Sequence, residues 1–271
     1  MRGSPLSRLL ALFVLGLIPV SGLHAQVERT YSLLVHPIFT PSQAQMVYRP
    51  LVEYLNETTP YRFELETARD FHRYWLDVRR GQTPDLVLED AHLIALRMER
   101  HGYIPLVRAD ESTSFSLLSS DMDAMDLDDF VGRPVSSMPA PSLGYLVLAS
   151  WFTNPMQQPV LESSAASWLD AVEIVFGMEA EAAIVPHNLV RRYVNMNVVA
   201  SSSEFPHLTI AASPALPESV RQDIRDALLR LHEDSAHFNA LHELDIQQFV
   251  AASADEYIGL ESWLDWVFAG F

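Results

Sequence analysis

The sequence predicts an α/β protein whose strands form mainly parallel sheets flanked by helices. Two features predict this class. Short apolar runs bounded by turns alternate with longer segments of helical periodicity, and several helical segments begin at a capping residue. Strands that alternate with helices in this way pair in parallel through right-handed crossovers. Ligands then bind beyond the carboxyl ends of the strands.

The composition indicates a well-packed and strongly acidic protein. Of its 271 residues, 49% are hydrophobic and none is cysteine or lysine, and the formal net charge is −17. Such a hydrophobic content supports a sizeable core and argues against disorder. The charge argues against partners such as nucleic acid or anionic membranes, and a site for an anion must rely on local donors. The lack of cysteine excludes disulfides and lipidation at an N-terminal cysteine.

Residues 1–25 have the features of a secretory signal peptide. Arg2 and Arg8 precede an apolar run over residues 9–18, and Ala25 ends a cleavage motif. An uncleaved membrane anchor is the alternative, but the apolar run is short for a full span. We therefore expect a periplasmic protein without a lipid anchor and without membrane insertion after cleavage.

The first half of the mature chain alternates between strands and helices. Thr40 is placed to cap the first helix, with Pro41 at its first position, and Gly81 closes the second helix. The strands predicted here cover residues 30–35, 61–67, 85–88 and 103–108, and the helices cover 43–57, 70–80 and about 93–100.

The second half continues with shorter elements. Strands are predicted at 114–119, 134–138, 182–185, 198–201 and 208–212, and helices at 142–152, 167–176, 217–232, 235–243 and 253–271. The acidic run at 121–129 is interpreted as a solvated turn and short helix, because a metal-binding loop would need glycine at its tight turn. Trp263, Trp266 and Val267 are interpreted as packing residues.

Two lobes are inferred from the order of these elements. No internal repeat, low-complexity linker or Gly-Ser hinge marks a boundary. We place the boundaries near Ser112 and Ser202. Residues 26–112 and 203–271 then form a discontinuous outer lobe, residues 113–202 form an inserted lobe, and the ligand cleft is expected between them.

Residues 134–145 have the pattern of a site for a polar ligand. A short strand ends in a proline-rich turn, Ser142 can cap the next helix, and Gly144 leaves the first turn without a side chain. Such a helix start can bind an anion or polar group through free backbone N–H groups. The alternative is a capped helix start that binds nothing.

Six segments, in order, resemble the periplasmic solute-binding proteins of phosphate, phosphite and phosphonate transport, a branch of the type II (transferrin-like) binding proteins. They are 48–55 (YRPLVEYL), 81–86 (GQTPDL), 127–135 (LDDFVGRPV), 139–145 (PAPSLGY), 181–185 (EAAIV) and 249–257 (FVAASADEY). The resemblance implies a two-lobed, monomeric binder that closes about a hinge and has no catalytic activity or cofactor. It also implies delivery of a small polar, oxyanion-type solute such as phosphonate to an ABC permease or a membrane sensor protein.

The resemblance further implies which residues contact the solute. Ser142, Gly144 and Tyr145 would contact it from one lobe, and the turns 36–40 and 89–92 from the other. The full predicted set is His36, Thr40, Glu89, Asp90, His92, Ser142, Gly144, Tyr145 and His187.

The sequence departs from the family pattern in three places. Glu89 and Asp90 stand where the family often has small or amide donors, so they repel a phosphonate unless they bind its amine or point away. Leu143 stands where the family often has a second hydroxyl residue before the glycine of the helix start. Pro186 and His187 stand after the strand at 181–185, where the family frequently has a carboxylate. These differences concern the ligand more than the fold.

Three histidines, His36, His92 and His187, each follow a predicted strand at the expected edge of the cleft. We interpret them as hydrogen-bonding partners of the solute or as contacts that hold the lobes together. With Asp90 they could instead enclose a divalent metal, although no H-x-x-x-H pair supports this. The histidines interpreted as surface residues are His207, His232, His237 and His242.

Two other classes of function are weighed against solute transport. An orphan sensory or interaction module would use the acidic lobe surface to engage a receptor. An enzyme is disfavoured, because Ser142 lacks the Gly-x-Ser-x-Gly setting of a nucleophile and no acid–base pair emerges.

Overall fold

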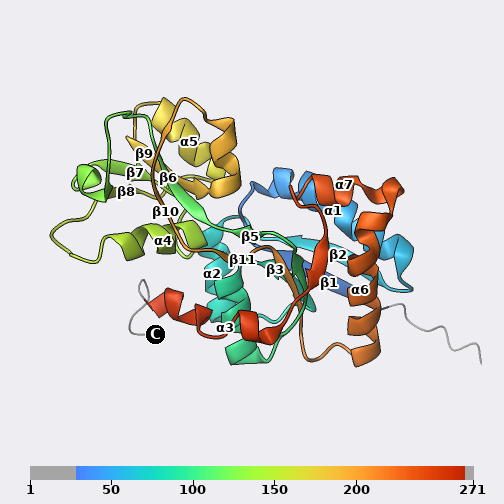
Figure 1. Cartoon of the computed structure of the whole chain (residues 1–271). Coiled ribbons are helices and arrows are strands. Elements are labelled where there is room, and N and C mark those ends of the chain that lie inside the picture. The colour runs from blue at the N-terminus through green and yellow to red at the C-terminus, as the bar shows by residue number, and fades with distance from the viewer. Residues whose placement is uncertain (1–28, 266–271) are drawn as a thin grey trace, which may run out of the picture.

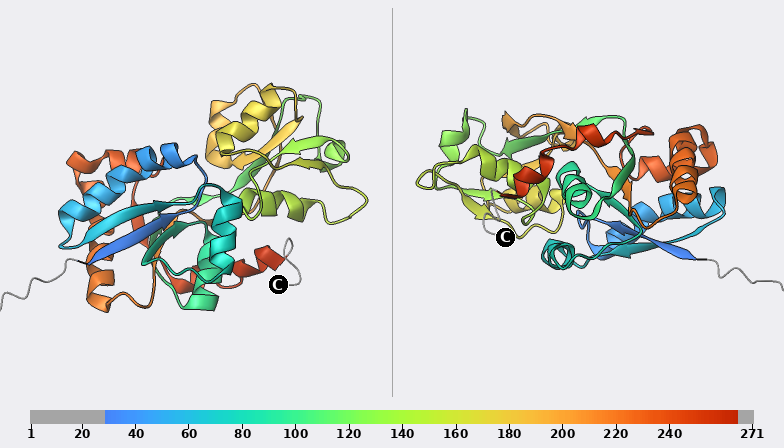
Figure 2. Two further views of the ribbon diagram at one scale, coloured as in Figure 1. Left: turned by 180° about the vertical axis from the view of Figure 1, so that it is seen from behind. Right: turned by 90° about the horizontal axis from the view of Figure 1, so that it is seen from below.

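The computed structural model describes residues 29–265, and the predicted signal peptide lies outside this range. Two bodies lie side by side, each built on one mixed sheet with helices against it (Figure 1, Figure 2). In the described range, no helix combines the length and apolar character needed to cross a membrane.

The larger sheet has the strand order β13-β4-β12-β3-β1-β2. Its strands are β1 (Thr30–Val35), β2 (Arg62–Thr67), β3 (Leu86–Glu89), β4 (Ile104–Ala109), β12 (Thr209–Ala212) and β13 (Phe249–Ala251). β1 pairs in parallel with β2 and β3, and β12 runs antiparallel between β3 and β4. Strands β1 to β4 therefore point the same way. The helices of this body are α1 (Pro41–Thr58), α2 (Phe71–Arg79), α3 (Ala91–His101), α6 (Glu218–Arg230) and α7 (Asn239–His242).

The smaller sheet has the strand order β10-β6-β9-β7-β8. Its elements are β6 (Phe115–Ser119), β7 (Pro134–Ser136), α4 (Leu143–Trp151), β8 (Val160–Glu162), α5 (Trp168–Phe176), β9 (Ala182–Pro186) and β10 (Asn197–Ser201). β7 pairs in parallel with β8 and β9, and β6 runs antiparallel between β9 and β10. The predicted α/β class with mainly parallel sheets is confirmed, with β6, β12 and β13 as antiparallel strands.

A two-stranded ribbon joins the bodies. It pairs β5 (Ser112–Thr113) with β11 (Phe205–Pro206) in antiparallel fashion. The chain leaves the larger sheet from β4 through β5 to β6, and it returns from β10 through β11 to β12. The chain therefore crosses twice between the bodies, both times through this ribbon.

The predicted caps explain where α1 and α4 begin. The Thr40 hydroxyl accepts from the Gln43 backbone N–H, and Pro41 opens α1. Ser142 caps α4 by accepting from the Tyr145 N–H. Both caps were predicted and are confirmed.

The C-terminal segment differs from its prediction. Instead of one helix over 253–271, the described part contains 3₁₀ turns at Ala254–Glu256 and Leu260–Leu264. Gly259 interrupts them with a φ of +85°, a conformation that a continuous helix cannot contain. Trp263 still packs as predicted, edge-on to Phe205 of the ribbon, whereas Trp266 and Val267 lie outside the described residues. The helix predicted at 235–243 is likewise divided, into a 3₁₀ turn (Ser235–His237) and the short α7.

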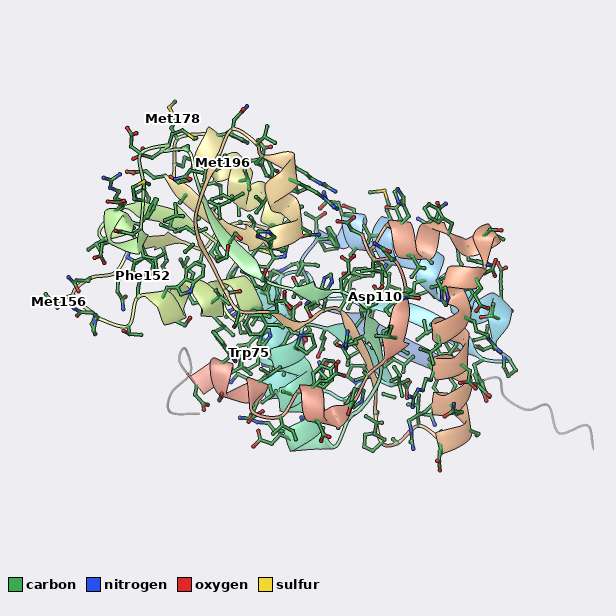
Figure 3. The ribbon with its side chains drawn as sticks, in the orientation of Figure 1. Trp75, Asp110, Phe152, Met156, Met178 and Met196 are labelled. Atoms are coloured by element: carbon green, nitrogen blue, oxygen red, sulfur yellow. The ribbon has the colours of Figure 1, made fainter. Side chains whose placement is uncertain are left out.

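The core continues from one body into the other. Side chains of α2 and α3, such as Phe71 and Leu93, share a buried cluster with Phe115, Leu146 and Trp168 of the smaller body. The most exposed methionines, Met156 and Met178, lie on the outer side of that body, away from this contact (Figure 3).

Candidate functional site

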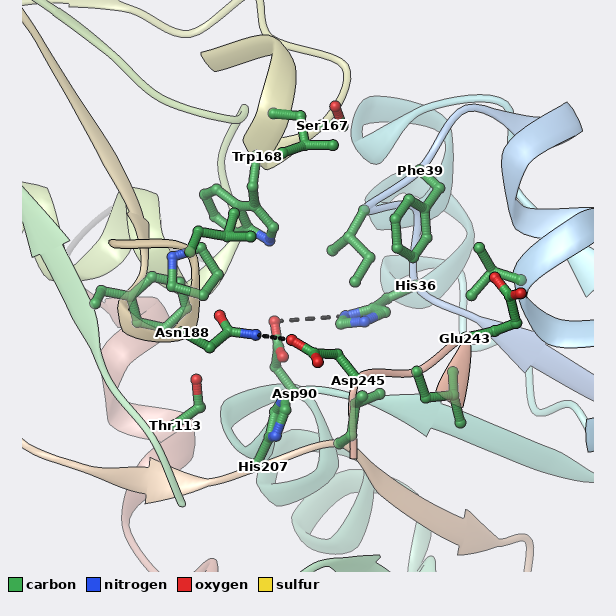
Figure 4. Close-up of a pocket in the computed structure, with 18 of the residues that line it drawn as sticks. His36, Phe39, Asp90, Thr113, Ser167, Trp168, Asn188, His207, Glu243 and Asp245 are labelled. Atoms are coloured by element: carbon green, nitrogen blue, oxygen red, sulfur yellow. Dashed lines mark hydrogen bonds and ion pairs between the residues drawn. The ribbon is translucent and has the colours of Figure 1, made fainter. Parts of the chain in front are cut away.

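A cavity of about 230 Å³ lies between the two bodies (Figure 4). It is bordered by the carboxyl ends of β1, β3 and β9 and by the starts of β6, β12 and α5. Six of its lining residues are His36, Phe39, Asp90, Trp168, Asn188 and His207. This is the position at which α/β sheets bind ligands.

Asp90 and His36 lie side by side in this cavity (Figure 4). His36 Nδ1 is 3.4 Å from Asp90 Oδ2, a contact without hydrogen-bond geometry that is ionic only when His36 is protonated. Burial raises the pKa of the Asp90 carboxyl, but the nearby imidazoles, His36 first, outweigh burial and hold the pKa below its ordinary value. Asp90 precedes α3 but makes no capping hydrogen bond to it. The cavity therefore contains an ionised carboxylate that is not used by its own helix.

Buried polar atoms beside Asp90 lack partners. Both ring nitrogens of His36 and the hydroxyl of Tyr48 have no hydrogen-bond partner within residues 29–265. His36 is 1% exposed and Tyr48 is fully buried. Burial, and then Asp90, raise the pKa of Tyr48, so its hydroxyl keeps its proton. Because buried polar groups are normally hydrogen-bonded, these atoms are available to bind a ligand in the cavity.

His207 lines the cavity, which corrects its interpretation as a surface residue. It lies between β11 and β12. Burial lowers the pKa of its ring more than Asp90 raises it. The imidazole is therefore neutral near neutral pH and can both donate and accept a hydrogen bond.

Aromatic side chains form the walls of the cavity. Phe39 lies on the side of the larger sheet, and Trp168 lies across from it on the smaller body (Figure 4). Trp168 is the first residue of α5, which Ser167 caps, and its ring centroid is 5.4 Å from that of Phe115. The walls can hold an apolar or aromatic group.

The exposed rim carries charges of both signs. Asp245 accepts a hydrogen bond from Asn188 Nδ2 at 2.9 Å and pairs with Arg191 at 3.3 Å. Glu243 and Arg192 also line the rim. The Asn188–Asp245 bond connects the two bodies across the mouth of the cavity.

Glu89, although adjacent to Asp90, does not line the cavity. It is fully buried, and Arg97 Nε donates to both of its carboxylate oxygens, at 2.8 and 2.7 Å. The Tyr74 hydroxyl donates to it as well. Glu89 is thus a structural carboxylate, pointing away from the cavity.

His92 connects the two bodies. It is fully buried on α3, and its Nε2 is 2.8 Å from the carbonyl oxygen of Pro141, just before α4. Burial lowers the pKa of its ring more than Asp90 raises it. The neutral imidazole can donate to this carbonyl, which fits the interpretation of a lobe contact.

The start of α4 is covered rather than open. Ser142 is fully buried, and its hydroxyl caps the helix and donates to the carbonyl of Met138. A Cβ on Gly144 would lie 2.7 Å from the Trp168 ring and 3.0 Å from that of Phe115. Contact between a solute and Ser142 or Gly144 stays a prediction, and it requires Trp168 to move.

Three other predicted residues lie apart from the cavity lining. Tyr145 borders a separate hollow with Phe152. Thr40 is engaged in capping α1. His187 is exposed, and its Nδ1 is 2.8 Å from the hydroxyl of Ser116. Of the predicted set, the cavity thus brings together His36 and Asp90.

The metal alternative finds no support. Across the described residues, no group of three His, Cys, Asp or Glu side chains is placed to hold a metal ion. His187 bonds to Ser116 instead of joining His36, His92 and Asp90. The acidic run at 121–129 forms the predicted turn and a short 3₁₀ helix, Leu127–Phe130, capped by Asp126.

The comparisons with known proteins agree with the fold and the position of the cavity. A family model described as "ABC transporter, phosphonate, periplasmic substrate-binding protein" matches residues 33–257. The chain belongs to this family. Its members are periplasmic solute-binding proteins of transport systems rather than enzymes. Among curated proteins, none matches this sequence.

Solved structures confirm the two-lobed fold of this family for the chain. PhnD1 from Prochlorococcus marinus in complex with methylphosphonate is 11% identical with a TM-score of 0.73, over 89% of this chain and 99% of that one. A binding protein component of an ABC phosphonate transporter from Pseudomonas aeruginosa is 14% identical with a TM-score of 0.70, over 87% and 85%. A Xanthomonas citri protein bound to ATP is 17% identical with a TM-score of 0.67, over 89% and 97%.

Sequence reasoning missed several cavity residues for one reason. His207 and Phe115 stand at the starts of β12 and β6, and both strands run antiparallel to their neighbours. The start of an antiparallel strand lies at the same edge as the carboxyl ends of the parallel strands. Helix α5 adds Trp168 directly after its cap, so the Ser167–Trp168 helix start was the signal available in the sequence.

Proposed function

We propose that the protein captures a small solute in the cavity between its two bodies and closes over it by bending at the β5–β11 ribbon. The observation that carries this proposal is the group of unpartnered buried atoms of His36 and Tyr48 beside the ionised Asp90. A solute in the cavity would give these atoms hydrogen-bond partners. Closure of two lobes around a ligand is a known type of transition.

In this proposal the lobes are residues 26–112 with 203–271 and residues 113–202. The two crossings of the ribbon support these boundaries. The closed form would present one continuous surface to an ABC permease in the membrane, and the leader at 1–25 would direct the protein to the periplasm. The family supports a role in transport rather than catalysis.

A sensory module remains the second candidate. The observation in its favour is the ring of Trp168, which covers the helix start that the family resemblance assigns to the solute. A changed ligand site is compatible with reporting a solute to a membrane sensor. Both candidates require capture of a solute and differ in the partner that reads the closed form.

The test is a ligand screen with two readouts. The panel contains phosphate, phosphite, alkyl- and aminophosphonates, sulfonates, amino acids, polyamines and divalent metals. A solute at a hundredfold excess over its Kd adds about 2.7 kcal/mol, which raises Tm by several degrees. Small-angle scattering of the same mixture should show a smaller radius of gyration. A panel that changes neither quantity contradicts capture by closure.

A further inference from the structure

The cavity contains more negative than positive charge. Asp90, Glu243 and Asp245 line it, Arg192 is the guanidinium among its lining residues, and Asp245 is paired with Arg191 on the rim. His207 adds no positive charge near neutral pH, because burial lowers its pKa. At the Asp90 carboxylate an entering anion meets repulsion, whereas an ammonium group meets attraction.

An ionised carboxylate, that of Asp90, already lies at the start of α3. A helix N-terminus favours negative charge, and many helices bind a phosphate group at this end. Here Asp90 occupies the position before α3 with an ionised carboxylate that is 8% exposed. The neighbouring His36 imidazole stabilises Asp90 as an anion, and a second anion at the same place would lie against it.

The groups around Asp90 suit an amine that carries an apolar body. The unpartnered Tyr48 oxygen and His36 ring lie beside the carboxylate and can complete a polar pocket. Beyond them, Phe39, Phe115 and Trp168 form aromatic walls, which favour both apolar groups and cations.

We propose that the solute is an organic ammonium, a small amine with an aliphatic or aromatic body. Its ammonium group pairs with Asp90, and its body lies between Phe39 and Trp168. The net charge of −17 raises the local concentration of such cations around the protein. This inference rests on the proposed function, because it names the solute that the same cavity captures.

The first experiment compares matched probes by calorimetry with the purified protein. The probes are 2-phenylethylamine, its neutral analogue 2-phenylethanol, the anion 3-phenylpropionate, and methylphosphonate. The amine should bind at least about tenfold more tightly than the alcohol, since only the ammonium compensates a buried charge. Tighter binding of either anion, or equal binding of the alcohol, overturns the inference.

The second experiment locates the ammonium. Asp90→Asn should weaken binding of 2-phenylethylamine by about tenfold or more, whereas Asp255→Asn, which removes an exposed carboxylate outside the cavity lining, should change it by less than about threefold. Trp168→Leu should also weaken it while Asp90 stays in place. Circular dichroism and melting curves verify that each variant folds. Unchanged affinity in Asp90→Asn contradicts the assignment.

The outcomes separate this inference from the function on which it rests. If methylphosphonate or another panel solute binds and contracts the protein while amines do not bind, the ammonium assignment is wrong and capture by closure stands. If no probe binds or contracts the protein, both are wrong.

Discussion

The two helices that begin beside the contact between the bodies, α3 and α4, start alike and have different surroundings. Each follows a strand of its sheet, β3 or β7, and each is preceded by a residue of the capping type. Ser142 uses its side chain to cap α4, and Trp168 covers the first turn. Asp90 does not cap α3, and its carboxylate faces the cavity. A capping signal therefore describes a helix, and neighbouring residues decide whether its start is open to a ligand.

The largest change in the free energy of unfolding is expected at Glu89, the buried carboxylate that precedes Asp90 in the sequence. Glu89→Gln should lower the free energy of unfolding by about 3–5 kcal/mol, because it leaves the buried Arg97 guanidinium without its counter-charge. Urea unfolding measures this loss. Asp90→Asn is the matched control, and it should cost no more than about 1 kcal/mol, since Asn can adopt the same turn. Equal losses would show that the two carboxylates have the same role.

The next effect tests how tightly α4 is covered. Gly144→Ala should cost about 1–3 kcal/mol, because its Cβ meets the Trp168 ring at 2.7 Å. Gly177→Ala is the control, since that Cβ has no contact closer than 3.4 Å and the residue has a φ of −72°. Thermal or urea unfolding gives both values. A Gly144→Ala protein as stable as the control would mean that Trp168 leaves the α4 start open.

A smaller change in stability is expected at Ser142, and it tests whether this residue caps α4 or binds the solute. Ser142→Ala should lower stability by about 1 kcal/mol, because the first turn of α4 loses its cap. Affinity for 2-phenylethylamine should stay the same, because Ser142 is fully buried and its hydroxyl is already engaged by Met138 and Tyr145. Calorimetry and unfolding on the same preparation give both numbers. A stable variant with weakened binding would restore the α4 start as the site.

The last effect is a dependence of stability on pH. Burial lowers the folded-state pKa of His92 and of His207 below the ordinary value of about 6.5. The unfolded chain then binds more protons below that pH, so stability should fall as the pH drops, by at most about 1.4 kcal/mol per pH unit for each proton. His237, whose pKa Asp234 raises, acts in the opposite direction from the surface. His92→Gln should flatten the slope measured between pH 7 and 5, and an unchanged slope would contradict a buried neutral His92.

The sequence predicted the fold better than the site, for a physical reason. Strands, caps and sheet edges depend on local pattern, so the limits of β1 and the cap of α1 agree with their predictions. The cavity depends on which strands reverse direction, and no local pattern shows that β6 and β12 run antiparallel. His207 and Phe115 were missed for that reason.

The central claim is that the solute binds at the α3 start and not at the α4 start. The most direct measurement is calorimetric titration of 2-phenylethylamine into three proteins: the unaltered chain, Asp90→Asn and Ser142→Ala. Our account predicts that affinity falls by about tenfold or more in Asp90→Asn and stays the same in Ser142→Ala. The reverse order, with Asp90→Asn unchanged and Ser142→Ala weakened, would contradict it.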